Sequence, residues 1–185
     1  MDSNTKALAT AAYNKATALI ETVFETFESY CQSIGESFDV RASMNRFDAL
    51  LQFSLIEMAI ADKDFDLEEV KFIRDLSRYC DFCEYLNQTG GSSISWNDLY
   101  NAKISTLNKL LETCKTEMAK LNQEFVSLFT IVDKAITELD LISMLKDAIF
   151  NIFTALAGAD GDYSKKELRG DYLIFIALMA IEQNL

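Results

Sequence analysis

Carboxylate side chains gather at two short segments of this 185-residue chain, and carboxylates are the groups that hard cations prefer as ligands. Residues 61–70 read Ala-Asp-Lys-Asp-Phe-Asp-Leu-Glu-Glu-Val, and residues 159–168 read Ala-Asp-Gly-Asp-Tyr-Ser-Lys-Lys-Glu-Leu. The two segments align without gaps. Each has Ala-Asp, a second Asp two positions later, an aromatic residue, a helix-capping residue and a Glu three positions after the cap. This pattern predicts an internal repeat of two helix–acidic turn–helix units.

Part of each acidic turn has a purely structural explanation. Asp66 with Glu69, and Ser164 with Glu167, have the spacing of helix capping boxes. Capping does not need the two Asp residues before each cap, and the negative end of the preceding helix dipole disfavours them. A bound cation would relieve that repulsion, whereas solvated turn residues are the alternative. The candidate metal ligands are Asp62, Asp64, Asp66, Glu69, Asp160, Asp162 and Glu167.

The two turns differ in charge. Residues 57–69 hold six acidic residues and one Lys, whereas residues 158–171 hold four acidic and three basic residues. If only one turn binds a divalent cation, we expect it to be the first, and oxygen ligands favour calcium or magnesium over zinc. Neither turn is an EF-hand, because both lack the Gly at position 6 and the Glu at position 12 of that loop.

The cysteines give a weaker signal. Of Cys31, Cys80, Cys83 and Cys114, only Cys80 and Cys83 form a close C-x-x-C pair. A four-cysteine zinc site normally uses two such pairs, and no βαβ pattern of the kind that carries a redox C-x-x-C motif is visible. We therefore interpret all four as reduced, small apolar residues, with zinc binding and redox chemistry as the alternatives.

The composition excludes several classes of function. The sequence has no His, which excludes Ser-His-Asp and Cys-His catalytic sets, His-ligated zinc and a proximal-His haem. It also shows no Gly-rich phosphate loop, nucleophile motif or cofactor fingerprint, so we expect no enzyme and no organic cofactor. A two-metal hydrolase built only from Asp and Glu is the enzymatic alternative. The net charge of −12 disfavours binding of nucleic acid or anionic lipid, because the overall field repels phosphate.

Helices must position the acidic turns, because the chain has no Pro, six Gly and no period-two alternation. Gly35 is placed to end the first helix, and Ser95 is placed to cap the helix that follows the loop at 87–95. The fold class is therefore all-α. The apolar spacing predicts helices at residues 4–34, 41–61, 67–86, 139–158 and 165–184.

A period of 3.5 residues runs through the middle of the chain. Residues 96–138 then form either one helix of about 40 residues or two helices broken near Leu121 to Glu124, and the N-terminal helix could pack antiparallel against them. The apolar stripe is explained either by ordinary core packing or by an exposed seam that takes a protein partner, a homodimer included. The stripe consists of Tyr100, Ile104, Leu107, Leu111, Cys114, Met118, Leu121, Phe125, Leu128 and Val132.

At its acidic turns the sequence resembles the tellurite-resistance protein B (TerB)-like family. Its members are all-helical and have two similar halves, each with an apolar helix that ends in Ala-Asp-Gly, a short turn and a helix that begins with an acidic residue. Residues 159–167 match that pattern, and residues 61–69 match it except that Lys63 replaces the Gly. The resemblance covers about residues 42–185.

The resemblance implies a bacterial cytoplasmic protein without known catalysis. It also implies a link to stress responses, tellurite resistance among them, and to complexes at the inner face of the membrane. Carried over by position, the candidate cation ligands are Asp62, Glu69, Asp160 and Glu167. The other three candidates come from the charge argument alone.

Together these observations predict one all-helical domain over residues 1–185. Residues 1–40 would be an N-terminal extension, residues 41–86 the first half and residues 96–185 the second half. We expect a non-enzymatic, cytoplasmic protein that binds divalent cations and acts in a stress response or as a scaffold with protein partners. The alternative is a helical interaction or dimerisation module whose acidic turns only cap helices. We expect no signal peptide and no transmembrane segment, because the apolar stretches are interrupted or too short.

Overall fold

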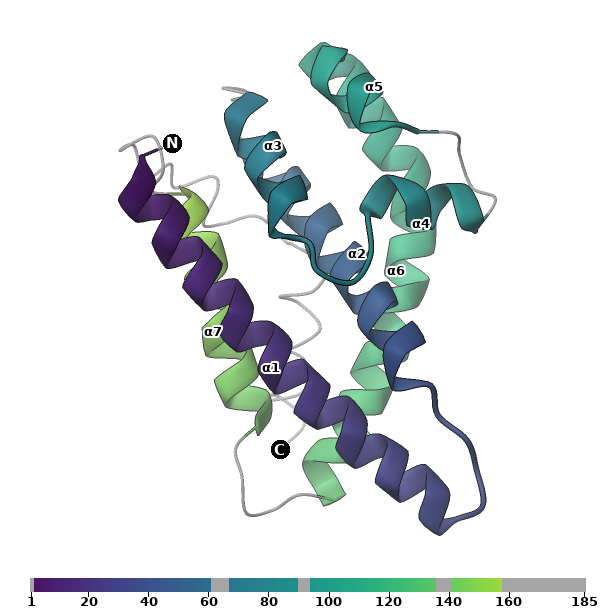
Figure 1. The fold of residues 1–185 in the computed structure, drawn as a ribbon. Helices are drawn as coiled ribbons and strands as arrows, with labels where there is room; N and C mark the ends of the chain where they lie inside the picture. The colour runs from purple at the N-terminus through teal and green to yellow at the C-terminus, as the bar shows by residue number, and fades with distance from the viewer. Residues whose placement is uncertain (1, 61–66, 90–93, 136–140, 158–185) are drawn as a thin grey trace.

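The computed structural model describes residues 2–60, 67–89, 94–135 and 141–157, and in these ranges helices are the only regular elements (Figure 1). The all-α prediction is therefore confirmed, while the arrangement in two similar halves stays a prediction. The helices are α1 (Ser3–Ser33), α2 (Val40–Ala59), α3 (Leu67–Leu76), α4 (Phe82–Gln88), α5 (Trp96–Asn101), α6 (Ile104–Ala135) and α7 (Leu141–Ala157).

Local signals define both ends of α1, and the one at Gly35 was predicted. The Asp2 carboxylate accepts the backbone N–H groups of Asn4 and Thr5 at 2.8 and 2.9 Å, which caps the N-terminus. At the other end Gly35 has a φ of 79°, and the N–H of Glu36 donates to the carbonyl of Cys31 at 2.9 Å. This is a Schellman termination, in which the left-handed residue is Gly because an L side chain is strained there.

α2 lies at the centre of the fold. The Asp39 carboxylate caps it, and fourteen of its twenty residues are buried. It contacts α1, α3, α4, α6 and α7. Because neighbours surround α2, even Gln52 and Ser54 on it are buried.

The predicted single helix over residues 67–86 is wrong, because α3 and α4 are separate helices. The chain between them, Ser77 to Asp81, is held by buried polar groups of α2. The Asp48 carboxylate accepts the consecutive backbone N–H groups of residues 78, 79 and 80 at 3.1–3.2 Å. The side chain of Gln52 donates to the carbonyl of Cys80 and accepts from the N–H of Phe82. These bonds replace the helical hydrogen bonds that the break removes.

The predictions for residues 96–138 also need correction. Ser95 caps α5 as predicted and forms a capping box with Asp98, but this helix ends at Asn101. α6 then runs without interruption through residues 121–124, where the two-helix alternative placed a break. Eight residues of the 3.5-period stripe are buried in the core, as the core-packing explanation of the stripe requires. They are Leu107, Leu111, Cys114, Met118, Leu121, Phe125, Leu128 and Val132.

α1 packs most extensively against α7 rather than against α6, the partner suggested by the sequence (Figure 1). Its contact with α6 is smaller and is made through aromatic rings: Phe24 stacks on Phe125 with ring centroids 5.6 Å apart. Among the helices that the structure describes, none combines the length and apolar character that crossing a membrane requires.

Candidate functional site

Most of the predicted cation ligands cannot be placed. Asp62, Asp64, Asp66, Asp160, Asp162 and Glu167 lie outside the described residues. Glu69 is described: it lies in the first turn of α3 and is 9% exposed. Within the described ranges no group of three or more His, Cys, Asp or Glu side chains could hold a metal ion. The cation site therefore stays a prediction from the sequence.

The cysteines are free thiols, and three of the four are buried. Cys80 lies in the break between α3 and α4, and Cys83 lies in the first turn of α4. Burial raises the pKa of Cys80 to about 11 and that of Cys83 to about 12. Both thiols are therefore protonated at neutral pH, and a protonated thiol is a poor nucleophile.

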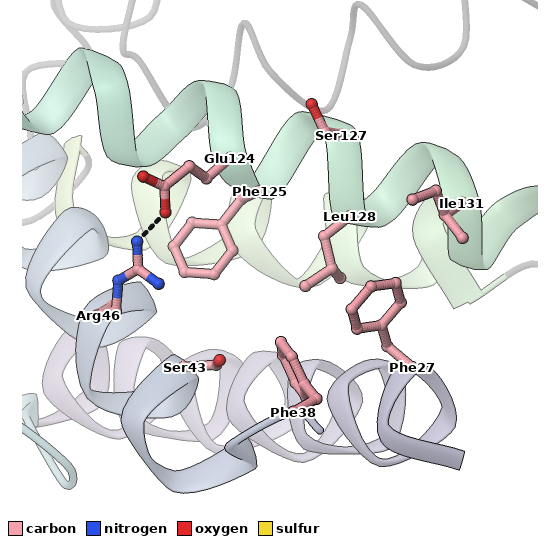
Figure 2. A pocket seen from close by; sticks show the side chains of 9 residues that line it. All are labelled: Phe27, Phe38, Ser43, Arg46, Glu124, Phe125, Ser127, Leu128 and Ile131. Atoms are coloured by element: carbon pink, nitrogen blue, oxygen red, sulfur yellow. Dashed lines mark hydrogen bonds and ion pairs between the residues drawn. The ribbon is translucent and has the colours of Figure 1, made fainter. Parts of the chain in front are cut away.

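An apolar pocket of about 380 Å³ opens where the C-terminal part of α1, the start of α2 and the C-terminal half of α6 meet (Figure 2). Apolar and aromatic side chains make up most of its wall, which is the usual lining of a binding pocket. The residues that line it are Phe27, Phe38, Ser43, Arg46, Glu124, Phe125, Ser127, Leu128 and Ile131.

The turn after α1 shapes one side of this pocket. Because α1 ends at the left-handed Gly35, the chain reverses and brings Phe38 back against Phe27. Their ring centroids lie 4.9 Å apart, and the rings meet edge to face at 82°. The chain then enters α2 at the capping residue Asp39, which places Ser43 and Arg46 on the pocket wall.

α6 supplies the opposite side. Phe125 is 3% exposed and also belongs to the core, where it packs edge to face against Phe47 with ring centroids 5.6 Å apart. It stacks on Phe129 at 5.9 Å. A pocket wall that is anchored in a packed aromatic cluster is rigid, so the pocket is largely preformed.

An ion pair between Arg46 and Glu124 lies at one end of the pocket, and Phe27 and Ile131 lie at the other (Figure 2). The Arg46 and Glu124 side chains are 39% and 58% exposed, so water screens the pair and it adds little to stability. Both charges can therefore exchange partners when a ligand arrives.

Apolar surface continues beyond the pocket. Ile131 is 41% exposed on its wall, and Tyr30, at 42%, lies beside Phe27 with ring centroids 6.0 Å apart. Ile34, in the turn after α1, is 57% exposed. The lining thus offers apolar and aromatic contact together with one exposed ion pair.

No protein-family model, curated protein or solved structure matches the chain. The resemblance to the TerB-like family therefore stays a prediction that rests on the two acidic turns.

Sequence reasoning missed the pocket. Leu128 belongs to the predicted 3.5-period stripe and Phe27 to the helix predicted at residues 4–34, and apolar spacing does not distinguish core positions from pocket positions. The available signal was Phe38, an aromatic residue three positions after the helix-ending Gly35 and directly before the capping residue Asp39.

Proposed function

We propose that this chain is a non-catalytic helical binding module that docks a partner protein through the α1–α2–α6 pocket. The observation that carries the proposal is an aromatic-walled pocket that opens onto exposed apolar side chains. Exposed apolar surface next to a preformed pocket is typical of a protein–protein contact, where one or two anchor side chains provide most of the affinity.

The charge of the surroundings indicates the chemistry of the partner. Arg46 and Glu124 on the pocket wall pair with each other, so the field around the pocket is set by the net charge of −12 of the whole chain. A segment with basic flanks is attracted by this field, whereas an acidic segment is repelled. We infer a helix that presents two large apolar residues one turn apart to the pocket and Lys or Arg on its flanks.

The test compares two synthetic amphipathic helical peptides that share one Leu and Phe face and differ only in carrying Lys or Glu on the flanks. Fluorescence anisotropy measures their binding to the full chain. We expect the Lys peptide to bind at least tenfold more tightly. Ile131→Gln should weaken its binding about tenfold, because apolar contact in the pocket is lost without a change of charge.

Met144→Gln is the matched control. Met144 is 42% exposed, almost the same as Ile131, but it lies on α7 and does not line the pocket. Its substitution should leave the affinity unchanged. Equal binding of the two peptides, or equal effects of the two substitutions, contradicts the proposal, because the attraction would then not depend on this pocket.

Binding of divalent cations by the acidic turns is the second candidate function. Its support is the pair of Asp residues in each turn that capping does not require. The first turn follows the end of α2 at Ala59 and precedes α3, whose first turn carries Glu68 and Glu69. A TerB-like stress-response or scaffold protein of the cytoplasm would have this property. The expected signature is stabilisation by divalent cations beyond the effect of ionic strength.

A further inference from the structure

A second apolar groove, of about 420 Å³, lies between the N-terminal half of α1 and the last turns of α7. None of the described residues that line it also lines the pocket described above, and these residues come from the two helices. They are Leu8, Ala11, Ala12, Lys15, Asn151, Thr154 and Ala155.

The side chains that line the groove allow another helix to pack against it. Ala11, Ala12 and Ala155 are small, so another backbone can approach closely, and Leu8 projects at the edge with 57% of its surface exposed. Among the described residues that line it there is no acidic side chain, and Lys15, the base among them, is exposed and can keep its ammonium in water while its stem packs. An apolar helix docked here would bury Leu8 without burying a charge.

The chain itself contains a long apolar segment, and water disfavours its exposure. Residues 172–181 read Tyr-Leu-Ile-Phe-Ile-Ala-Leu-Met-Ala-Ile, ten apolar residues in succession. α7 ends at Ala157, beside the groove residues Thr154 and Ala155. Residues 158–164 can span about 23–25 Å when extended, and residues 165–184 would measure about 30 Å as a helix, which is long enough to cover the groove.

We propose that the groove along α1 and α7 is the docking site of the chain's own residues 165–184. The proposal does not depend on the function of the α1–α2–α6 pocket, because the two surfaces use different residues. Leu8 of α1 would then pack against residues 165–184 of the same chain.

The test places a photoreactive benzoylphenylalanine at position 8 of the full chain. Irradiation is followed by trypsin digestion and mass spectrometry. Trypsin cleaves after Lys165, Lys166 and Arg169, so residues 170–185 form one peptide that is identified by its mass. We expect cross-links from position 8 to this peptide. The matched control is position 34, which is equally exposed at 57% but lies at the other end of α1, and should give at least tenfold fewer such cross-links.

Mixing unlabelled and nitrogen-15-labelled chains distinguishes the two sources of the segment. Cross-links within one chain carry a single isotope, and that outcome supports the proposal. Cross-linked peptides of mixed isotope mean that the segment of a second copy fills the groove, which overturns it. Absence of cross-links to 170–185, or equal yields from positions 8 and 34, also overturns it. If the position 8 variant unfolds, the same residue is placed at position 15, the exposed lysine of the groove.

Discussion

Asp48 is the buried residue on which the connection between α3 and α4 depends. Its carboxylate, 1% exposed, accepts from three consecutive backbone N–H groups and from the hydroxyl groups of Ser77 and Tyr13. Burial, together with the neighbouring Asp48 carboxylate, raises the pKa of Tyr13 far above its usual range, so this phenol stays a donor. A single carboxylate therefore ties α1, α2 and the α3–α4 connection together.

Replacement of this carboxylate should be costly. Asp48→Ala leaves several buried donors unpaired, and we expect a loss of about 3–5 kcal/mol in the free energy of unfolding, measured with urea. Asp48→Asn should lose less, because its amide oxygen still accepts. The control is Asp75→Asn, whose side chain is 60% exposed and pairs only with its neighbour Arg74, and it should cost under about 0.5 kcal/mol. Equal losses at positions 48 and 75 would contradict this role.

At the scale of elements, Gly35 decides where α1 ends and how Phe38 reaches the pocket. Its φ of +79° is strained for an L side chain, and a Cβ there would have no atom within 4 Å. Gly35→Ala should therefore lower the free energy of unfolding by about 1 kcal/mol through backbone conformation alone. Gly35→Asn should cost less, since Asn tolerates the left-handed region. If urea unfolding shows that Gly35→Ala and Gly35→Asn lower the free energy of unfolding equally, the loss does not come from the positive φ at this position.

The elements that the sequence predicted correctly have signals within a few residues of their ends. Gly35, at the end of α1, and Ser95, at the start of α5, are examples of such end signals. The apolar spacing along α1 and α7 is a second kind of local signal. The break at Ser77–Asp81 contains no Gly or Pro. Its local signal is the capping residue Asp81, which accepts the N–H of Glu84, whereas the groups that hold the rest of it, Asp48 and Gln52, come from another helix. Local propensity favours continuing the helix there, and tertiary hydrogen bonds overcome it.

The sequence prediction missed the candidate pocket for a related reason. Its lining comes from three segments that are far apart in the chain, and each segment alone has the pattern of a core helix. Only the reversal after Gly35 and the crossing of α6 place Phe27, Phe38 and Leu128 around one opening. The acidic turns, by contrast, are visible in the sequence because their residues are contiguous.

At the scale of the whole molecule, the net charge of −12 means that any cation can stabilise the fold by screening repulsion. A binding site differs from screening because it saturates and depends on particular ligands. Thermal unfolding of chelator-stripped protein separates the two effects if calcium, magnesium, manganese or zinc replaces sodium at equal ionic strength. Free ion at about 100 times Kd adds about 2.7 kcal/mol, which is a midpoint rise of about 5–10 °C for a chain of this length.

Substitutions locate the effect. Asp62→Asn should remove more of the rise than Asp160→Asn, because the first turn has the larger acidic excess. Asp75→Asn changes the net charge equally at an exposed residue of α3 outside both turns, and it should leave the rise intact. If divalent ions and sodium give the same midpoint at equal ionic strength, the turns act only as helix caps. The acidic excess then acts through the long-range field that favours a basic partner at the α1–α2–α6 pocket.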